Sequence, residues 1–153
     1  MARISASERE ANKRTYDELI FDIFTNEGWD SITYDRLSKD LSVRKSTLQG
    51  YYPSRAHFGT ALQGKVLPQL LESLDLSSRE SFIDSWDKAL LQPQFSMVIR
   101  LFLENSLTPD TNSSARNGSN NLVRLLQGSM NREEAENLVQ MVYGRSIFFF
   151  MNE

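Results

Sequence analysis

The sequence predicts an all-α protein, with a three-helix helix-turn-helix domain followed by a short C-terminal helical bundle. Apolar residues recur at spacings of three and four along most of the chain, which is the period of an amphipathic helix. No segment shows the alternation of a half-buried strand, and no internal repeat occurs. Residues 31–55 combine two short helical patterns around a tight break, which is the layout of a helix-turn-helix.

The first helix is expected to begin near Ser5 or Ser7 and to end at Gly28, a typical C-terminal cap. Its buried stripe follows helical spacing and comprises Tyr16, Leu19, Ile20, Ile23 and Phe24. Ser31 or Thr33 is expected to cap the second helix, and the break follows at Ser42-Val43. A third helix then opens with Arg44 and Lys45 and runs to Tyr51, shortly before Pro53.

Further helices are expected after Pro53, which places the domain boundary between residues 1–53 and 54–153. A fourth helix is predicted over 55–74 with a kink at Pro68, a fifth is capped at Ser77-Ser78, and a sixth starts at Pro93. A polar loop is predicted over 108–120. It is followed by a short seventh helix at 122–126 and a last helix over 131–151. Asn131 followed three residues later by Glu134 resembles a capping box and marks the start of the last helix.

Composition excludes several classes of function. There is no Cys and only one His, His57, so thiolate chemistry and a histidine metal site are not expected. No nucleotide-binding loop, catalytic triad or metal-ligand spacing occurs, so we expect neither an enzyme nor a cofactor. The N-terminus lacks an apolar signal segment, and no apolar run is long enough to span a membrane, which fits a cytoplasmic protein.

Charge is distributed unevenly along the chain. Residues 1–65 hold ten Lys/Arg and nine Asp/Glu, whereas residues 66–153 hold seven and eleven. No Asp or Glu occurs from Leu41 through Leu71, although four basic residues lie in that stretch. A surface that approaches a polyanion must exclude carboxylates, so residues 41–71 fit a nucleic-acid contact despite the net charge of −3.

From Leu19 to Phe58 the chain resembles the DNA-binding domain of the TetR family of bacterial transcriptional regulators. The matching residues are Leu19 to Phe24, Gly28-Trp29, Thr33, Leu37, Val43, Lys45, Thr47-Leu48, Tyr51 to Arg55, and Phe58. The resemblance implies three N-terminal helices that bind DNA, with the third in the major groove, and a C-terminal bundle that dimerises. The chain departs from the family pattern at the turn, at the third-helix cap and after Leu48, where it has Ser42, Arg44 and Gln49.

Family position divides the expected DNA contacts into two classes. Thr47, Tyr51 and Arg55 match phosphate-contacting positions, and Thr33 could reach a phosphate or only cap the second helix. Arg44, Lys45 and Gln49 match positions that face bases, where Arg and Lys suit guanine and Gln suits adenine. Ser46 completes the polar face, while Val43, Leu48 and Tyr52 are expected in the core.

Two expectations concern the C-terminal bundle. Trp86, Phe95, Phe102 and Met141 fit either the core, which is the usual role of such residues, or the lining of an effector pocket. Leu138, Val142 and Phe149 on the last helix are expected at a homodimer interface, because this helix is apolar on more than one side. The alternative is that the last helix only closes the chain's own core.

The sequence therefore predicts a dimeric transcriptional regulator, most often a repressor in such families, that binds a double-stranded DNA operator. A small molecule or a protein is expected as its effector. The rival hypothesis is a TetR-fold adaptor that binds another protein through its C-terminal helices and binds DNA weakly or without specificity. Gln49, Ser42 and the short C-terminal part favour the adaptor, whereas the acid-free stretch 41–71 favours the regulator.

Overall fold

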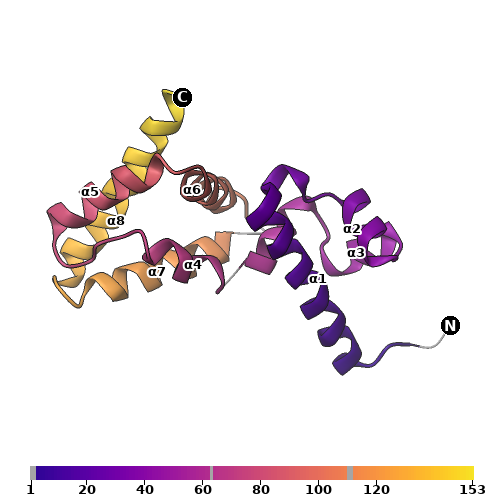
Figure 1. Ribbon diagram of the computed structural model, residues 1–153. Helices are drawn as coiled ribbons and strands as arrows, with labels where there is room; N and C mark the ends of the chain where they lie inside the picture. Colours follow the sequence, from indigo (N-terminus) through magenta and orange to yellow (C-terminus); the bar gives the residue numbers. More distant parts are fainter. Residues whose placement is uncertain (1–2, 63, 110–111) are drawn as a thin grey trace. The chain divides into compact units, whose positions relative to one another are not determined.

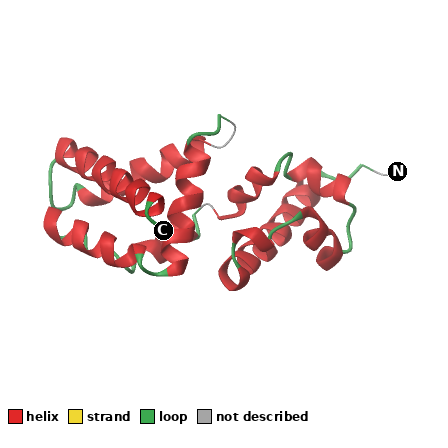
Figure 2. Ribbon diagram, turned by 90° about the horizontal axis from the view of Figure 1, so that it is seen from above, coloured by secondary structure: helices red, strands yellow, loops and turns green. Residues whose placement is uncertain are grey.

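The computed structural model describes residues 3–62, 64–109 and 112–153, and within them all regular structure is helical (Figure 1, Figure 2). The expected all-α fold is thus confirmed. The chain divides into two compact units, unit 1 over Met1–Gln63 and unit 2 over Gly64–Glu153. In the part of the chain that is described, no helix is long and apolar enough to cross a membrane.

Unit 1 begins and ends its helices at the polar signals of the sequence. Its elements are α1 Ala6–Glu27, the 3-10 helix η1 Trp29–Ser31, α2 Tyr34–Leu41, α3 Lys45–Tyr51 and the 3-10 helix η2 Arg55–Leu62. Ser5 caps α1 in a capping box, because its hydroxyl accepts from the Glu8 amide and the Glu8 carboxylate accepts from the Ser5 amide. Gly28 ends α1 with φ 94°, a conformation that favours glycine.

Buried apolar and aromatic side chains hold the short helices of unit 1 against α1. The buried set is Tyr16, Ile20, Ile23, Phe24, Ile32, Leu37, Leu48, Tyr51, Tyr52, Phe58, Ala61 and Leu62. The Tyr52 hydroxyl donates to Asp17 at 2.5 Å, and burial together with this bond raises the pKa of Tyr52. Arg36 donates to both carboxylate oxygens of Glu27, which ties α2 to the end of α1, and also to Asp40 within α2.

The predicted fourth helix is wrong, because the chain forms two separate elements there. η2 packs on α1 within unit 1, and the helix α4 covers Val66–Leu71 in unit 2. Gly64 lies between them with φ 75°, which interrupts a continuous helix. Pro68 falls in the first turn of α4, where its missing N–H removes no helical hydrogen bond, so it does not kink a longer helix.

Unit 2 continues with four longer helices around one core. These are α5 Arg79–Leu90, α6 Pro93–Ser106, α7 Asn112–Leu126 and α8 Arg132–Met151. Figure 1 shows α5 and α8 side by side, and α8 also contacts α6 and α7. The caps at Ser78 and Asn131 and the proline at the start of α6 are confirmed. The core comprises Phe82, Trp86, Ala89, Leu90, Phe95, Ile99, Leu122, Leu126, Ala135, Leu138, Val139 and Val142.

The polar loop predicted over 108–120 is wrong from Asn112 onward, because α7 begins there. Residues 110 and 111 lie outside the described part of the chain. Ala115 is buried on the early turns of α7, and the Ser119 hydroxyl lies 2.8 Å from the hydroxyl of Tyr143 on α8. Gly118 lets α7 pack closely on α6, since a Cβ there would lie 3.1 Å from the Phe102 ring. Tertiary contacts therefore override a Ser- and Asn-rich sequence of low helix propensity.

Two of the three residues expected at a dimer interface lie inside the chain's own core. Leu138 and Val142 are 0 % exposed, so they are not available to a partner, whereas Phe149 is half-buried against the same core. The polar group Ser146 is also fully buried, and its hydroxyl accepts from Trp86 Nε1 at 2.8 Å. The face that α8 leaves exposed instead carries Ile147, Phe148 and Met151.

The residues expected to line an effector pocket pack among their neighbours. Trp86 and Phe95 are buried in the unit 2 core with their rings edge to face at 5.2 Å. Phe102 contacts the Tyr143 ring at 5.4 Å, and Met141 sulfur accepts from Arg79 at 3.7 Å. Burial raises the pKa of Tyr143 to about 12, which fits a hydroxyl within a packed core. These contacts support the core alternative for Trp86 and Phe95, whereas Phe102 and Met141 are half-buried.

Candidate nucleic-acid interface

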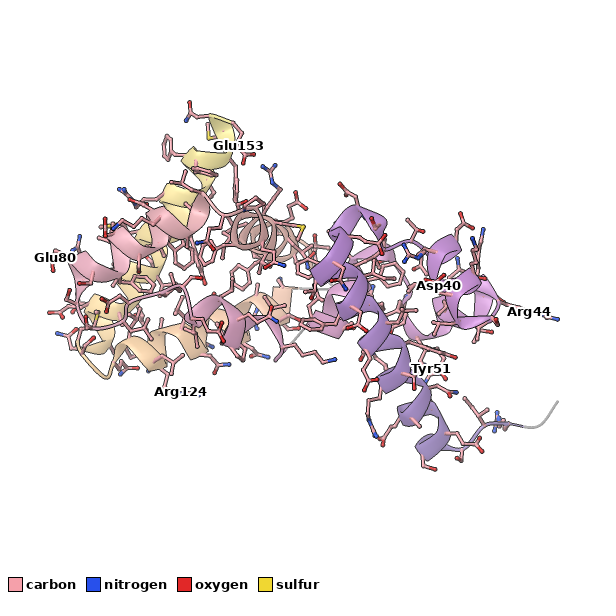
Figure 3. All side chains as sticks on the ribbon, viewed as in Figure 1. Asp40, Arg44, Tyr51, Glu80, Arg124 and Glu153 are labelled. Atoms are coloured by element: carbon pink, nitrogen blue, oxygen red, sulfur yellow. The ribbon has the colours of Figure 1, made fainter. Side chains whose placement is uncertain are left out.

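The third helix of unit 1 has one buried face and one exposed polar face. Leu48 is fully buried and Tyr51 is 8 % exposed, so these two side chains fix α3 against the core of unit 1. The exposed residues on and just before α3 are Arg44, Lys45, Ser46, Thr47 and Gln49. Figure 3 shows Arg44 pointing outward from the start of this helix. This seven-residue helix therefore presents a basic and polar surface to the solvent, while its buried side is anchored in the core of unit 1.

The turn that positions α3 contains a residue in the left-handed region. Ser42 has φ 55° and ψ 43°, as expected for a residue that stands where the family usually has glycine. The Ser38 hydroxyl donates to the Val43 carbonyl at 2.6 Å and closes the turn from the other side. Arg44 is the N-cap of α3 and makes no side-chain cap bond, so it leaves its guanidinium for other contacts.

Lys45 is paired within unit 1. Its ammonium group forms an ion pair with the carboxylate of Asp35 on α2, and both side chains are exposed. The acid-free stretch of the sequence therefore does not give an acid-free surface, because α2 brings a carboxylate to the start of α3. Sequence reasoning missed Asp35, since it considered the exclusion of acids only along the chain and not across the turn.

Tyr51 belongs to a small cluster with two residues of α1. The Arg9 guanidinium lies 4.3 Å from the centroid of the Tyr51 ring and donates to the Gly50 carbonyl at 2.9 Å. Asn12 donates to the Tyr51 hydroxyl oxygen at 3.3 Å. The Tyr51 O–H proton can therefore still be donated to another acceptor. Sequence reasoning missed Arg9 and Asn12, although they continue the face of Tyr16 toward the start of α1.

Arg55 and Thr33 have structural partners. Arg55 donates to the carbonyls of Ile32 at 3.2 Å and Trp29 at 2.9 Å, and it lies 5.0 Å from the Trp29 ring centroid. The Thr33 hydroxyl accepts from the Arg36 amide at 3.0 Å, which is an N-cap bond for α2. Capping is thus one role of Thr33, and its hydroxyl proton can still donate outward.

His57 also has a local partner, because its Nδ1 lies 2.7 Å from the Ser54 hydroxyl and 3.2 Å from the Ser54 amide. Among the described residues, no group of three or more His, Asp or Glu side chains is placed to hold a metal ion.

Comparison with known families decides the relationship of the chain. The sequence profile of the tetracycline repressor LuxT C-terminal domain matches residues 63–150, which is more than half of the chain. The chain belongs to the tetracycline repressor (TetR) family. The matched range covers nearly all of unit 2, whereas the helix-turn-helix geometry lies before it in unit 1. A search of curated proteins found no match.

Unit 1 brings together most of the polar residues that the sequence predicts to contact DNA. Arg44 to Thr47 and Gln49 share one exposed surface, which we call the α3 face. Tyr51 is only 8 % exposed, and Thr33 and Arg55 make hydrogen bonds with the segment before and at the start of α2. DNA contact by these residues remains a prediction.

Proposed function

We propose that this TetR-family chain is a dimeric DNA-binding transcriptional regulator that represses by placing α3 in the major groove of an operator. The observation that carries the proposal is the α3 face, in which two cations and three polar side chains are exposed on a helix anchored by Leu48 and Tyr51. An α-helix fits the major groove, where Arg44 and Lys45 can donate to guanine and Gln49 can pair with adenine.

A second set of groups would fix the helix on the DNA backbone. Thr47 is exposed on α3, and the Tyr51 hydroxyl and Thr33 hydroxyl each keep a proton to donate to a phosphate. Arg9 stands beside Tyr51 and adds a positive charge at the end of α3. Arg55 contributes charge, but its donors to the Trp29 and Ile32 carbonyls make it a support for the loop before α2.

The homodimer in this proposal uses the exposed apolar face of α8. Ile147, Phe148 and Met151 are 48 %, 66 % and 70 % exposed, and Leu125 on α7 is 44 % exposed. Apolar side chains of this size grouped on one helix are typical of an interface. Gly144 lies on the same helix, and nothing stands within 4 Å of the position of its missing Cβ, so a partner helix has room to approach.

An adaptor that binds another protein is the second candidate function, and a specific observation favours it. Two of the cations expected on DNA already have partners, because Lys45 pairs with Asp35 and Arg55 binds two carbonyls. In this alternative the exposed face of α8 would bind the other protein, and duplex binding would be weak and unspecific.

A salt titration with random duplex and with duplex selected from the source genome separates the two functions. We expect the parent protein to bind both, with affinity falling steeply as salt rises, and to prefer the selected duplex. Arg44→Ala with Lys45→Ala should abolish the preference while the far-UV circular dichroism stays unchanged, since both side chains are exposed. Parent protein that shows no preference for any selected duplex would favour the adaptor.

The dimer is tested with Phe148→Glu, which places a charge on the exposed face of α8 without entering the core. Sedimentation should show a dimer for the parent and a folded monomer for Phe148→Glu. Leu107→Glu, at an apolar residue 86 % exposed at the end of α6, is the matched control and should remain dimeric if Phe148 marks the interface. A monomeric parent at micromolar concentration would exclude this part of the proposal.

A further inference from the structure

An acidic side chain lies against the predicted DNA-contacting cation Lys45. Asp35 is on the first turn of α2 and Lys45 is on the first turn of α3, so the ion pair joins the two helices of the helix-turn-helix. The Asp35 side chain is 78 % exposed and the Lys45 side chain is 57 % exposed. Both groups are therefore open to a third charged partner such as a phosphate.

Asp35 is not needed to build α2. The helix start is capped by the Thr33 hydroxyl, and α2 is tied to α1 through the two bonds of Arg36 to Glu27. Exposed ion pairs of this kind contribute little to folding stability. The carboxylate therefore affects mainly the charge that the start of α3 presents to the solvent.

We propose that Asp35 competes with DNA for Lys45 and so lowers the affinity of the chain for duplex of any sequence. This inference rests on the proposed function. In the free protein the carboxylate neutralises the ammonium group, so a DNA phosphate or a guanine acceptor gains Lys45 only by displacing Asp35. The uncovered carboxylate then remains next to the polyanion and opposes binding by like-charge repulsion. Asp35 thereby restricts tight binding to duplexes that offer Lys45 a partner strong enough to displace it.

The competition has a definite signature in the salt dependence of binding. Each cation that neutralises a phosphate contributes about 0.9 to the slope of log affinity against log salt. While Asp35 cancels Lys45, the parent slope lacks part of that contribution. Asp35→Asn keeps the size and the hydrogen-bonding shape of the side chain but removes its charge, so it releases Lys45 to the DNA.

The test is a double-mutant cycle with the full chain, a labelled random duplex and a salt series. The four proteins are the parent, Asp35→Asn, Lys45→Gln and the double variant. We expect Asp35→Asn to bind about two- to tenfold more tightly at low salt, with a slope steeper by up to about 0.9. Lys45→Gln should cost little in the parent and should remove most of the gain in the Asp35→Asn background.

Asp84→Asn supplies the matched control. Asp84 pairs with Lys88 on α5 of unit 2, and both side chains are exposed, so this variant makes the same change in net charge outside the helix-turn-helix. We expect it to bind duplex as the parent does. An equal gain for Asp84→Asn would overturn the inference, because bulk charge would then explain both results. Unchanged or weaker binding by Asp35→Asn would also overturn it, the latter by making Asp35 a DNA contact.

The outcomes distinguish this inference from the proposed function. If the parent protein binds duplex and Asp35→Asn does not bind more tightly, the inference is wrong but the proposed function stands. Parent protein without measurable binding, together with tight binding by Asp35→Asn, supports the inference in its strongest form. Absence of binding by all four proteins sinks the proposed function and the inference with it.

Discussion

Unit 1 and unit 2 are both helical, but different forces fix where their helices begin and end. In unit 1 most helix ends are marked by a residue whose local chemistry suits the position, as at Ser5, Gly28, Thr33 and Ser42, although α3 starts at Arg44 without a side-chain cap. In unit 2 the caps at Ser78 and Asn131 act in the same way, yet the Ser- and Asn-rich early turns of α7 have low intrinsic helix propensity. Local signals thus specify unit 1, whereas packing specifies part of unit 2.

The difference bears on how each unit presents its surface. α2 has 8 residues and α3 has 7, which is too short for helices that are stable alone, so capping and burial of a few anchors must hold them. Their outward residues are then free to serve binding. In unit 2 the longest helix, α8, buries Ala135, Leu138, Val139 and Val142, and its exposed apolar side chains lie in the turns near its end.

The strongest way to break unit 2 is Val142→Arg. Val142 is 0 % exposed in the core, so the variant must bury an unpaired charge or unfold. We expect a loss of more than about 4 kcal/mol in the free energy of unfolding, enough to unfold the unit. Circular dichroism and Trp86 fluorescence in a Trp29→Phe background, where Trp86 is the single tryptophan, would follow it.

Gln140→Arg is the control for Val142→Arg, since Gln140 is exposed on the same helix and its replacement should change stability little. A folded monomeric Val142→Arg protein would instead restore the interface role first expected for this residue and contradict its burial.

A smaller effect on unit 2 is expected from Ser146→Ala. The Ser146 hydroxyl accepts from Trp86 Nε1 at 2.8 Å in the buried core, so its removal leaves an indole N–H without that partner. An unsatisfied buried donor costs about 1–3 kcal/mol, which chemical denaturation followed by Trp86 fluorescence would detect. Ser96→Ala removes a more exposed hydroxyl on α6 and should change stability by less than about 0.5 kcal/mol. Equal losses in the two variants would argue against the buried bond.

The helix ends that the sequence predicts correctly are those set by local signals, and the ones it misses depend on packing between helices. The ends of α1, the cap of α2, the strained turn at Ser42 and the exposed face of α3 could all be predicted, because each depends on residues close in sequence. The early turns of α7 could not, because they depend on contacts with Tyr143 and Phe102 on other helices. The break at Gly64 was missed because Leu62, Val66 and Leu70 keep a helical spacing across it.

The candidate site shows the same limit. The polar face of α3 follows from helical periodicity, since Leu48 and Tyr51 are apolar enough to define the buried side. The pairing of Asp35 with Lys45 and the placement of Arg9 on Tyr51 join residues from different helices. The exposed surface of α8 also depends on contacts between helices. Apolar residues occur all round this helix, and only packing decides that Val142 is buried and Phe148 exposed.

In unit 1 the local signal at the turn can be sharpened with Ser42→Gly. Ser42 adopts φ 55°, which costs a non-glycine residue about 1–2 kcal/mol, and part of that returns as entropy of the unfolded glycine chain. We expect a net stabilisation of up to about 1 kcal/mol, measured as slower amide hydrogen exchange in α2 and α3. Ser46→Gly, at an exposed position inside α3, should destabilise by about the same amount. Destabilisation by both variants would mean that the Ser42 side chain itself supports the turn.

The smallest effect is expected from the opposite substitution in unit 2, Gly144→Ala. Gly144 lies inside α8, and an added Cβ would meet nothing within 4 Å, so alanine should stabilise the helix by about 0.5–1 kcal/mol. Gly118→Ala is the matched control, because its Cβ would lie 3.1 Å from the Phe102 ring and the clash offsets the gain. If a partner helix uses the space at Gly144, the variant should also weaken the dimer in sedimentation, and Phe148→Glu should remove that second effect but not the first. If Gly144→Ala instead destabilises the Phe148→Glu monomer, the space around Gly144 is not open. The approach of a partner helix would then not explain why glycine stands at this position.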